Sequence, residues 1–300
     1  MLAPRLFAFA TLLGSSMVAA IPAVPHIING TPVKMFDEPF MAFVSVTPKI
    51  GNGTSCSGSI ISNRHILTAA HCVREFASPG SDKPFKTIAS VKVYTGHIDI
   101  NTMVNAPKYY EHDVINWDYS PDYLPSTATS KKDIYWPADI AVLTLQNKLQ
   151  WSDSVKPIKI ADVRSFGVNT LGTASGWGWI NGNPIVRTNV LRKGFVQITH
   201  PDTCATNWGY MFKKGISQFC TLSKTNEQGA TVDACHGDSG GPLLIKDKSN
   251  QNVQIGVVSF GQEVCNSAKP TVFVNPYSHR EYIAKVTGLK YSDFISEVSN

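Results

Sequence analysis

The stretch DACHGDSGGP, residues 233–242, places Ser239 between glycine-lined flanks and beside an aspartate. Glycines this close together indicate unusual backbone angles or the close approach of another group, which suits a site better than a core strand. A serine hydroxyl is a weak nucleophile at neutral pH. Catalysis by Ser239 would therefore need a base, a group that orients the base, and hydrogen-bond donors for the developing oxyanion.

Each of these requirements has a candidate in the chain. His71 follows the apolar run of ILTAAHCV and directly precedes Cys72, so a cross-link could fix a histidine base at this position. Asp139 opens the apolar segment DIAVLTL, where an unpaired carboxylate would be costly to bury. The backbone N–H groups of Gly237 and Ser239 could both point at one oxygen. These residues together predict nucleophilic catalysis at Ser239.

Short β-rich segments, separated by Gly, Pro and Asn, must position these residues. They span 40–46, 87–96, 139–145, 191–199, 242–246, 254–260 and 271–274. Many short strands without regular helical partners predict an all-β barrel or sandwich. One longer helix is predicted at 277–286, and the stretch 97–137, rich in Tyr, Asp and Pro, is predicted to form long surface loops.

The start of the chain predicts export. Residues 1–20 carry one arginine, then an apolar stretch, then small residues, which is the order of a cleaved signal peptide. We therefore expect a secreted, extracellular protein with a short pro-segment at 21–26. The formal net charge of +5 is modest, and its basic residues are scattered, so we expect neither nucleic-acid nor membrane partners.

Export changes how the cysteines are interpreted. An oxidising compartment favours disulfides over metal sites for the six cysteines, among which there is no CxxC pair, and spacing alone leaves fifteen pairings open. Asn-X-Thr sequons at Asn29 and Asn52 predict glycosylation, with Asn52, in the loop segment IGNGTS, as the better candidate.

The segments LTAAHC, DIAVL and GDSGGP occur in this order, with SGWG at 175–178 between the second and the third. Together they resemble the motifs of the chymotrypsin-like (trypsin-fold) serine peptidases, and the similarity runs from Ile27 to about Val286. Any one motif alone is a weak signal, whereas the ordered set is specific. The resemblance implies two six-stranded antiparallel β-barrels with a C-terminal helix, a peptidase domain at 27–286, and an unassigned C-terminal extension at 287–300.

The resemblance also implies roles for these residues. Ser239 would be the nucleophile, His71 the general base and then acid, and Asp139 the residue that holds the histidine tautomer. Backbone N–H groups of Gly237 and Ser239 would form the oxyanion hole. The reaction would be amide hydrolysis through an acyl-enzyme, without a metal or cofactor, in a monomer whose partners are protein or peptide substrates and protein inhibitors.

Disulfide pairs are implied by the same resemblance. They are Cys56 with Cys72, Cys204 with Cys220, and Cys235 with Cys265. The first would brace the histidine, and the third would brace the loop before the serine.

Activation is implied at Ile27. In this family a newly cut N-terminus folds inward, and its ammonium pairs with the aspartate beside the serine, here Asp238. The preceding residue is His26, where trypsinogen-like proenzymes usually have Lys or Arg. We therefore expect a different processing peptidase, or trimming of the pro-segment without regulation.

Asp233 resembles the carboxylate at the base of the trypsin primary pocket, which predicts cleavage after Lys or Arg. Gly261 matches the open pocket mouth, and Ser259 would offer backbone contacts to the bound peptide. Thr271 stands where trypsin-like members have glycine, and it resembles the narrowed pockets of elastase-like members. Cleavage after small apolar residues therefore remains the alternative.

Other features bear on substrates and on competing functions. Trp136 is either an aromatic shelf for substrate or a packed surface residue, and His236 is expected at the pocket rim. The segment GHIDINTMVN lacks the paired glutamates of a trypsin calcium loop. A secreted binding protein that keeps the fold without activity is the competing function class, although such relatives usually lose a residue that this chain retains.

Overall fold

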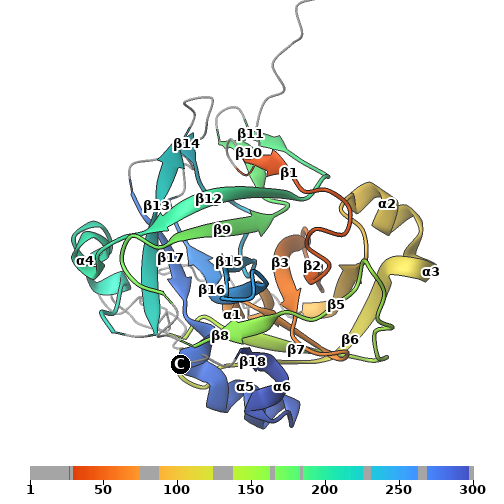
Figure 1. Ribbon diagram of the computed structural model, residues 1–300. Coiled ribbons are helices and arrows are strands. Elements are labelled where there is room, and N and C mark those ends of the chain that lie inside the picture. Colours follow the sequence, from red (N-terminus) through yellow and green to blue (C-terminus); the bar gives the residue numbers. More distant parts are fainter. Residues whose placement is uncertain are drawn as a thin grey trace, which may run out of the picture.

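The computed structural model describes residues 27, 30–74, 88–123, 138–162, 166–182, 185–215, 217–225, 231–262 and 269–296. Within these ranges the chain folds mainly as strands (Figure 1). The predicted signal peptide, pro-segment, Asn29, Trp136 and Cys265 lie outside the described residues. None of the described helices is both long and apolar enough to cross a membrane.

The first barrel is a closed sheet of six antiparallel strands. Its order is β2 (Met41–Pro48), β3 (Thr54–Ile60), β4 (His65–Thr68), β7 (Ala141–Leu145), β6 (Glu111–Tyr119) and β5 (Ile88–Thr95). Every second side chain of β2 is buried from Ala42 onward, which is the period of a strand with one face in a core. Val44 of β2 lies opposite Cys56 of β3 and Val93 of β5, and all three side chains are buried inside the barrel.

The second barrel closes through the pairing of β12 with β13. Its order is β12 (Arg192–Ile198), β9 (Leu171–Gly176), β15 (Pro242–Lys246), β16 (Asn252–Phe260), β17 (Thr271–Val274) and β13 (Gln218–Thr225). Leu243, Ile255 and Phe273 fill its core. The predicted architecture of two six-stranded antiparallel barrels is therefore confirmed, and Figure 1 shows the barrels side by side, with β12 and β9 on the left and β2 and β3 on the right.

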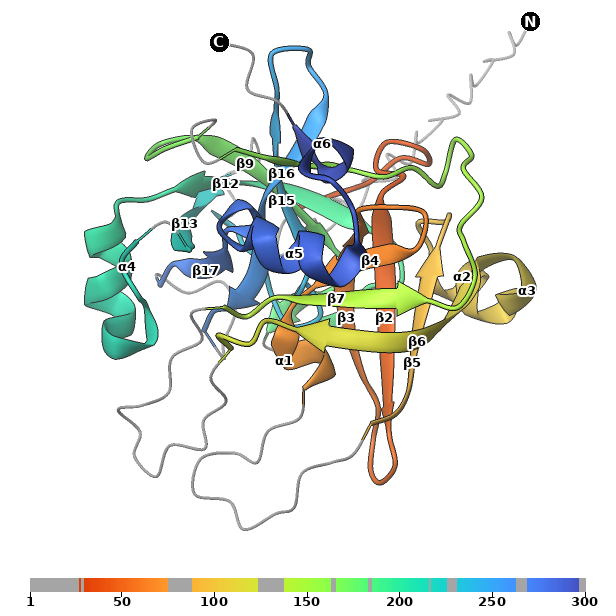
Figure 2. The ribbon, with the colours of Figure 1, turned by 90° about the horizontal axis from the view of Figure 1, so that it is seen from below.

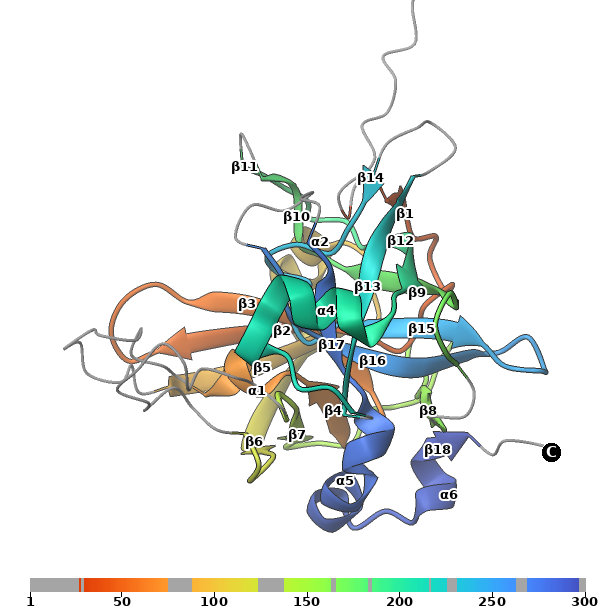
Figure 3. The same cartoon turned by 90° about the vertical axis from the view of Figure 1, so that its left-hand side faces the viewer.

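Short elements extend or cover the barrels. They are β1 (Thr31–Pro32), α1 (Ala70–Val73), α2 (Ile100–Asn105), α3 (Pro107–Tyr110), β8 (Lys159–Ala161), the hairpin β10 (Trp179–Gly182) and β11 (Ile185–Arg187), α4 (Pro201–Trp208), the 3-10 helix Gly209–Met211, and β14 (Thr231–Val232). Figure 3 shows α4 in front of the second barrel, close to β13.

The C-terminal segment packs against both barrels. A 3-10 turn at Pro276–His279 leads into α5 (Arg280–Thr287), so the predicted C-terminal helix is present (Figure 2). After it, α6 (Tyr291–Phe294) and β18 (Ile295–Ser296) follow, and β18 pairs with β8. Ile283 and Phe294 are fully buried in the cluster that includes the first-barrel core. The described part of the predicted extension at 287–300 is thus packed onto the domain.

The prediction of loops across 97–137 is wrong for part of that stretch. Ile100–Asn105 form α2, Pro107–Tyr110 form α3, and Glu111–Tyr119 form β6, a full strand of the first barrel. The side chains of β6 are exposed or half-buried along its whole length, so the segment lacks the apolar alternation by which a strand is predicted. Its strand conformation follows from pairing with β5 and β7.

Candidate active site

His71 lies in the short helix α1, directly after the buried end of β4. The apolar residues before it are fully buried, and the next residue, Cys72, is bonded to Cys56 of β3. The helix is thereby attached to the barrel wall at the point where the imidazole leaves it. The predicted cross-link beside His71 is confirmed.

Asp139 is completely buried and receives hydrogen bonds from three donors. Its Oδ2 accepts from His71 Nδ1 at 2.7 Å and from Ser259 Oγ at 2.6 Å, while its Oδ1 accepts from the backbone N–H of His71 at 2.8 Å. A carboxylate can only accept, so His71 Nδ1 carries the proton and, in the neutral ring, Nε2 has the lone pair. The imidazole is held in the tautomer that a general base requires.

The hydroxyl of Ser259 was not foreseen from the sequence, which indicated only backbone contacts for this residue. Its bond to Asp139 crosses 120 positions of chain, and no local pattern signals such a pair. The bond satisfies a lone pair of a buried carboxylate and helps to fix its orientation.

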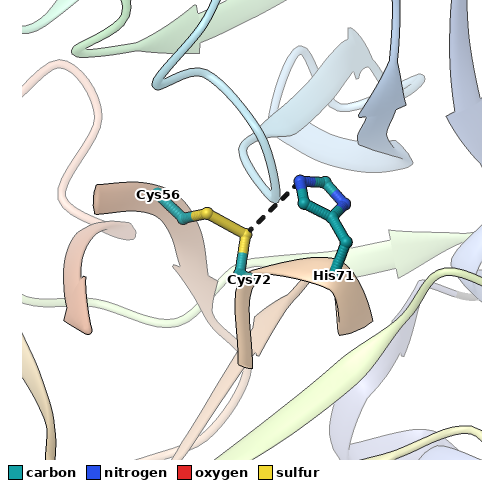
Figure 4. Close-up of side chains that lie close together, drawn as sticks. All are labelled: Cys56, His71 and Cys72. Carbon is teal, nitrogen blue, oxygen red and sulfur yellow. Dashed lines mark hydrogen bonds between the residues drawn. A yellow bond between two sulfur atoms is a disulfide. The ribbon is translucent and has the colours of Figure 1, made fainter. Parts of the chain in front are cut away.

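Cys56, His71 and Cys72 form a group whose candidate ligand atoms all lie within 4.8 Å of one another (Figure 4). In Figure 4 the dashed line joins Cys72 Sγ and His71 Nε2, 3.8 Å apart, and the two sulfurs are bonded to each other. A cysteine binds a metal ion as a thiolate, and the sulfur atoms of a disulfide are not thiolates. This group therefore braces the histidine and does not form a metal site.

Ser239 lies in the turn before β15, where the second barrel meets the first. Its carbonyl accepts from the backbone N–H of Ser57 on β3 at 2.8 Å. A Cβ at Gly240, which has φ +78°, would lie 2.1 Å from Thr68 Oγ1 and 2.5 Å from the Ser57 carbonyl oxygen. Only glycine allows the turn to approach the first barrel this closely.

The backbone at Gly237 is fixed on both sides. The carbonyl of His236 accepts from the backbone N–H of Trp179 at 2.7 Å, and the carbonyl of Gly237 accepts from Ser57 Oγ at 3.1 Å. In a trans peptide the N–H points opposite to the carbonyl, so the Gly237 N–H points away from Trp179. Gly237, Ser239 and His71 line one cavity.

A second cavity of about 200 Å³ adjoins Ser239. Ala234, Ser259, Gly261 and Thr271 are among the residues that line it, and Asp233 is not among them. The Asp233 carboxylate is buried and accepts hydrogen bonds from Thr271 Oγ1 at 3.0 Å and from the Ala234 N–H at 2.9 Å. Burial raises the pKa of Asp233 to about 6. The Thr271 hydroxyl therefore donates a hydrogen bond to Asp233, the residue that was predicted at the base of the primary pocket.

The sequence profile of the family described as "Trypsin" matches residues 27–283. The chain belongs to the trypsin family. Trypsin 5G1 of Aedes aegypti is 29% identical over 94% of this chain and 96% of its own length. Collagenase of Hypoderma lineatum is 28% identical over 88% of both chains, and Chymotrypsin of Phaedon cochleariae is 29% identical over 86% of this chain and 81% of its own.

Membership of the trypsin family confirms the predicted resemblance and implies protein substrates. The relatives carry the names of a trypsin, a collagenase and a chymotrypsin. Family membership therefore does not determine which residue precedes the cleaved bond. The residues that line the cavity around Thr271 bear on that question.

In this trypsin-family chain, Ile27 and Asp238 are both buried. The Ile27 side chain packs in the core of the second barrel, and the Asp238 carboxylate accepts from the N–H groups of Gly178 and Cys235, both at 2.8 Å. Burial raises the pKa of Asp238 to about 7. The described residues offer this carboxylate no ion pair, and none joins it to Ile27.

The remaining predicted features lie around this core. The Cys204–Cys220 disulfide is present, and Cys235 is disulfide-bonded, while its predicted partner is outside the described residues. His236 is exposed, lines both cavities beside Ser239, and packs its ring 4.7 Å from that of Trp179. No local pattern indicates this contact, because only the fold brings Trp179 of β10 next to His236.

Proposed function

We propose that this protein is a secreted serine endopeptidase that hydrolyses peptide bonds through an acyl-enzyme. The hydrogen bond from His71 Nδ1 to the buried Asp139 carries the proposal, because it leaves the lone pair on Nε2 of a side chain that lines the same cavity as Ser239. In that role Nε2 takes the proton of Ser239 Oγ as the oxygen attacks the carbonyl carbon, and returns it to the leaving amine. A water molecule then attacks the acyl-enzyme, with His71 again as base and then acid, and the acyl group is released from Ser239.

The oxyanion would be stabilised by the N–H groups of Gly237 and Ser239. Each such donor is worth about 3 kcal/mol in comparable sites. The bonds that hold the peptides on either side of Gly237 support a preformed arrangement, since no backbone rotation is then needed when charge develops.

Export fits the disulfides of the described chain, because disulfides persist in oxidising compartments. The leader-like residues 1–20 supply the second support for secretion.

For specificity we propose cleavage after Lys or Arg. Asp233 is buried, has no ion pair among the described residues, and lies behind Thr271, which lines the cavity beside Ser239. Such a carboxylate favours a substrate that brings a cation. The second candidate, cleavage after small apolar residues, is favoured by Thr271, which lines the cavity and donates its hydroxyl to Asp233.

Exchanging Thr271 separates these candidates. Thr271→Gly removes the side chain from the cavity and one of the hydrogen bonds to Asp233 Oδ1, so kcat/KM for Arg relative to Ala should rise on the order of tenfold or more. The measurement is a cleavage profile of the processed protein on a mixed peptide library, read by mass spectrometry.

Thr271→Val is the matched control, since it removes the hydroxyl and retains the volume. It should leave the Arg-to-Ala ratio close to that of the wild type. A wild-type profile without preference for Lys or Arg over Ala and Val would contradict the proposed basic specificity and favour the small-residue alternative.

We further propose that cleavage before Ile27 activates the enzyme by giving Asp238 an ammonium partner. In the uncut chain the pKa of Asp238 is raised, so folding stability falls as pH rises from about 4 to 7. After cleavage the pair would raise the amine pKa. Its stabilisation is then present below the unfolded value of about 7.7–8 and lost as pH rises through the folded value.

The melting temperature of processed protein should therefore exceed that of unprocessed protein by most near pH 7, in a Ser239→Ala background that prevents self-cleavage. Relief of the raised Asp238 pKa, from about 7 back to 3.8, corresponds to about 4 kcal/mol of this advantage. The advantage should shrink towards pH 4 and again at alkaline pH, and Asp238→Asn should abolish its pH dependence. A difference that is flat from pH 4 to 10 would exclude this pairing.

A further inference from the structure

A larger cavity, of about 560 Å³, also borders Ser239, and Thr271 does not line it. The two cavities share His71, His236 and Ser239. If the residue before the cleaved bond occupies the smaller cavity, the chain after that bond runs into the larger one. This larger cavity is called the leaving-side cavity below.

Elements from both barrels build the leaving-side cavity. Phe43 of β2 and Ile100 of α2 come from the first barrel, and Trp177 and Trp179 come from the second. Phe43 meets Trp177 edge-on, with ring centroids 5.8 Å apart. The cavity thus has an aromatic and aliphatic wall close to the reactive serine.

The position of Ile100 is fixed by bonds between the barrels. Its N–H donates to the Asn189 carbonyl at 2.8 Å, and the carbonyl of the nearby Ile98 accepts from Leu191 N–H at 2.7 Å and from Trp177 Nε1 at 2.9 Å. The segment that replaces a calcium-loop sequence is therefore attached to the second barrel, and it holds Ile100 at the cavity.

The lining is poor in charge. Among the described residues that line the leaving-side cavity there is no Asp, Glu, Lys or Arg, and the titratable groups are His71 and His236. A charged side chain would find no oppositely charged carboxylate, ammonium or guanidinium group among these residues. Thr188 and Asn189 add polar atoms at the lining, which suit the hydroxyl of tyrosine or the N–H of tryptophan.

We propose that Ile100, with Phe43, selects substrates with an aromatic side chain in the first two residues after the cleaved bond. This inference rests on the proposed endopeptidase function. Ile100 acts on substrate choice by contact with the leaving part of the peptide, and it has no part in proton transfer.

The test uses the protein cleaved at the His26–Ile27 bond and peptides that share the same residues before the cleaved bond. The residues after the bond are varied among Phe, Tyr, Ala, Asp and Lys, and rates are divided by each enzyme's own rate on the anilide of the same acyl part. Wild-type protein should prefer Phe and Tyr over Ala on the order of tenfold, and over Asp and Lys by more.

Ile100→Asp introduces a carboxylate into the leaving-side cavity. It should remove the aromatic preference and make Lys after the bond the preferred residue, a change of selectivity that a loss of stability alone would not produce. Ile50→Asp is the matched control. Ile50 is 82% exposed at the β2–β3 turn and does not line the cavity, so this variant should keep the wild-type preference.

If the enzyme hydrolyses the anilide but cleaves all the peptides at equal rates, this inference is overturned and the proposed function stands. Retention of the aromatic preference in Ile100→Asp would also overturn the assignment to Ile100. Absence of anilide hydrolysis by the processed wild-type protein would overturn the proposed function and this inference together.

Discussion

Ser239→Ala is expected to lower kcat by a factor on the order of 10⁶, the scale seen when a Ser-His-Asp peptidase loses its nucleophile. In the proposed mechanism the hydroxyl of Ser239 forms the acyl-enzyme, and alanine has no hydroxyl. The fold should be retained, because the backbone carbonyl of Ser239, which bonds to Ser57, is unchanged. Steady-state hydrolysis of a chromogenic peptide measures the loss, and a thermal melt checks the fold.

The same variant decides between an enzyme and a non-catalytic binding relative. Hydrolysis at the wild-type rate in Ser239→Ala would mean that another group, or a contaminating peptidase, performs the reaction. Ser249→Ala supplies the control, since Ser249 lies in the exposed β15–β16 turn and should tolerate the change.

Asp139→Asn is expected to lower kcat on the order of 10⁴-fold at neutral pH. The carboxylate accepts from both the backbone N–H and the Nδ1–H of His71, and an amide can accept on only one of its two terminal atoms. An amide nitrogen facing Nδ1 would require the other tautomer, which leaves a proton on Nε2 and blocks proton transfer from Ser239.

This loss should appear in kcat, with a smaller effect on KM, because the interaction serves the transition state. Asp153→Asn is the matched control, since Asp153 is exposed and, within the described part of the chain, forms an ion pair with the exposed Lys156. A kcat for Asp139→Asn within tenfold of wild type would show that Asp139 does not hold the histidine in the required tautomer.

Strands could be predicted where a short segment is strongly apolar and is bounded by residues that end a strand. β15 and β17 match the predicted 242–246 and 271–274, because each is an apolar run bounded by Pro or Gly. β6 could not be predicted, because its side chains carry no buried periodicity and its conformation follows from its neighbours. The short helices α2 and α3 were missed for a similar reason, since each is too short to show a helical repeat.

The site shows the same division. The positions of His71 and Asp139 could be predicted from short motifs, and the structure brings them together at 2.7 Å. The contacts that Ser259 and Ile100 make depend on chain segments about 90 to 120 positions away, and nothing local encodes them. Thr271 was predicted on the pocket wall, but its hydrogen bond to Asp233 became visible only with the fold.

Active-site labelling tests the assignment of Ser239 most directly. The processed protein is treated with a fluorophosphonate, in which an activated serine oxygen displaces fluoride from phosphorus, and the labelled peptide is located by mass spectrometry. A single phosphonyl group on Ser239, formed far more slowly in Asp139→Asn, is the predicted result. Folded, processed protein that acquires no label on Ser239 would contradict the assignment and would identify the chain as a non-catalytic member of the trypsin family.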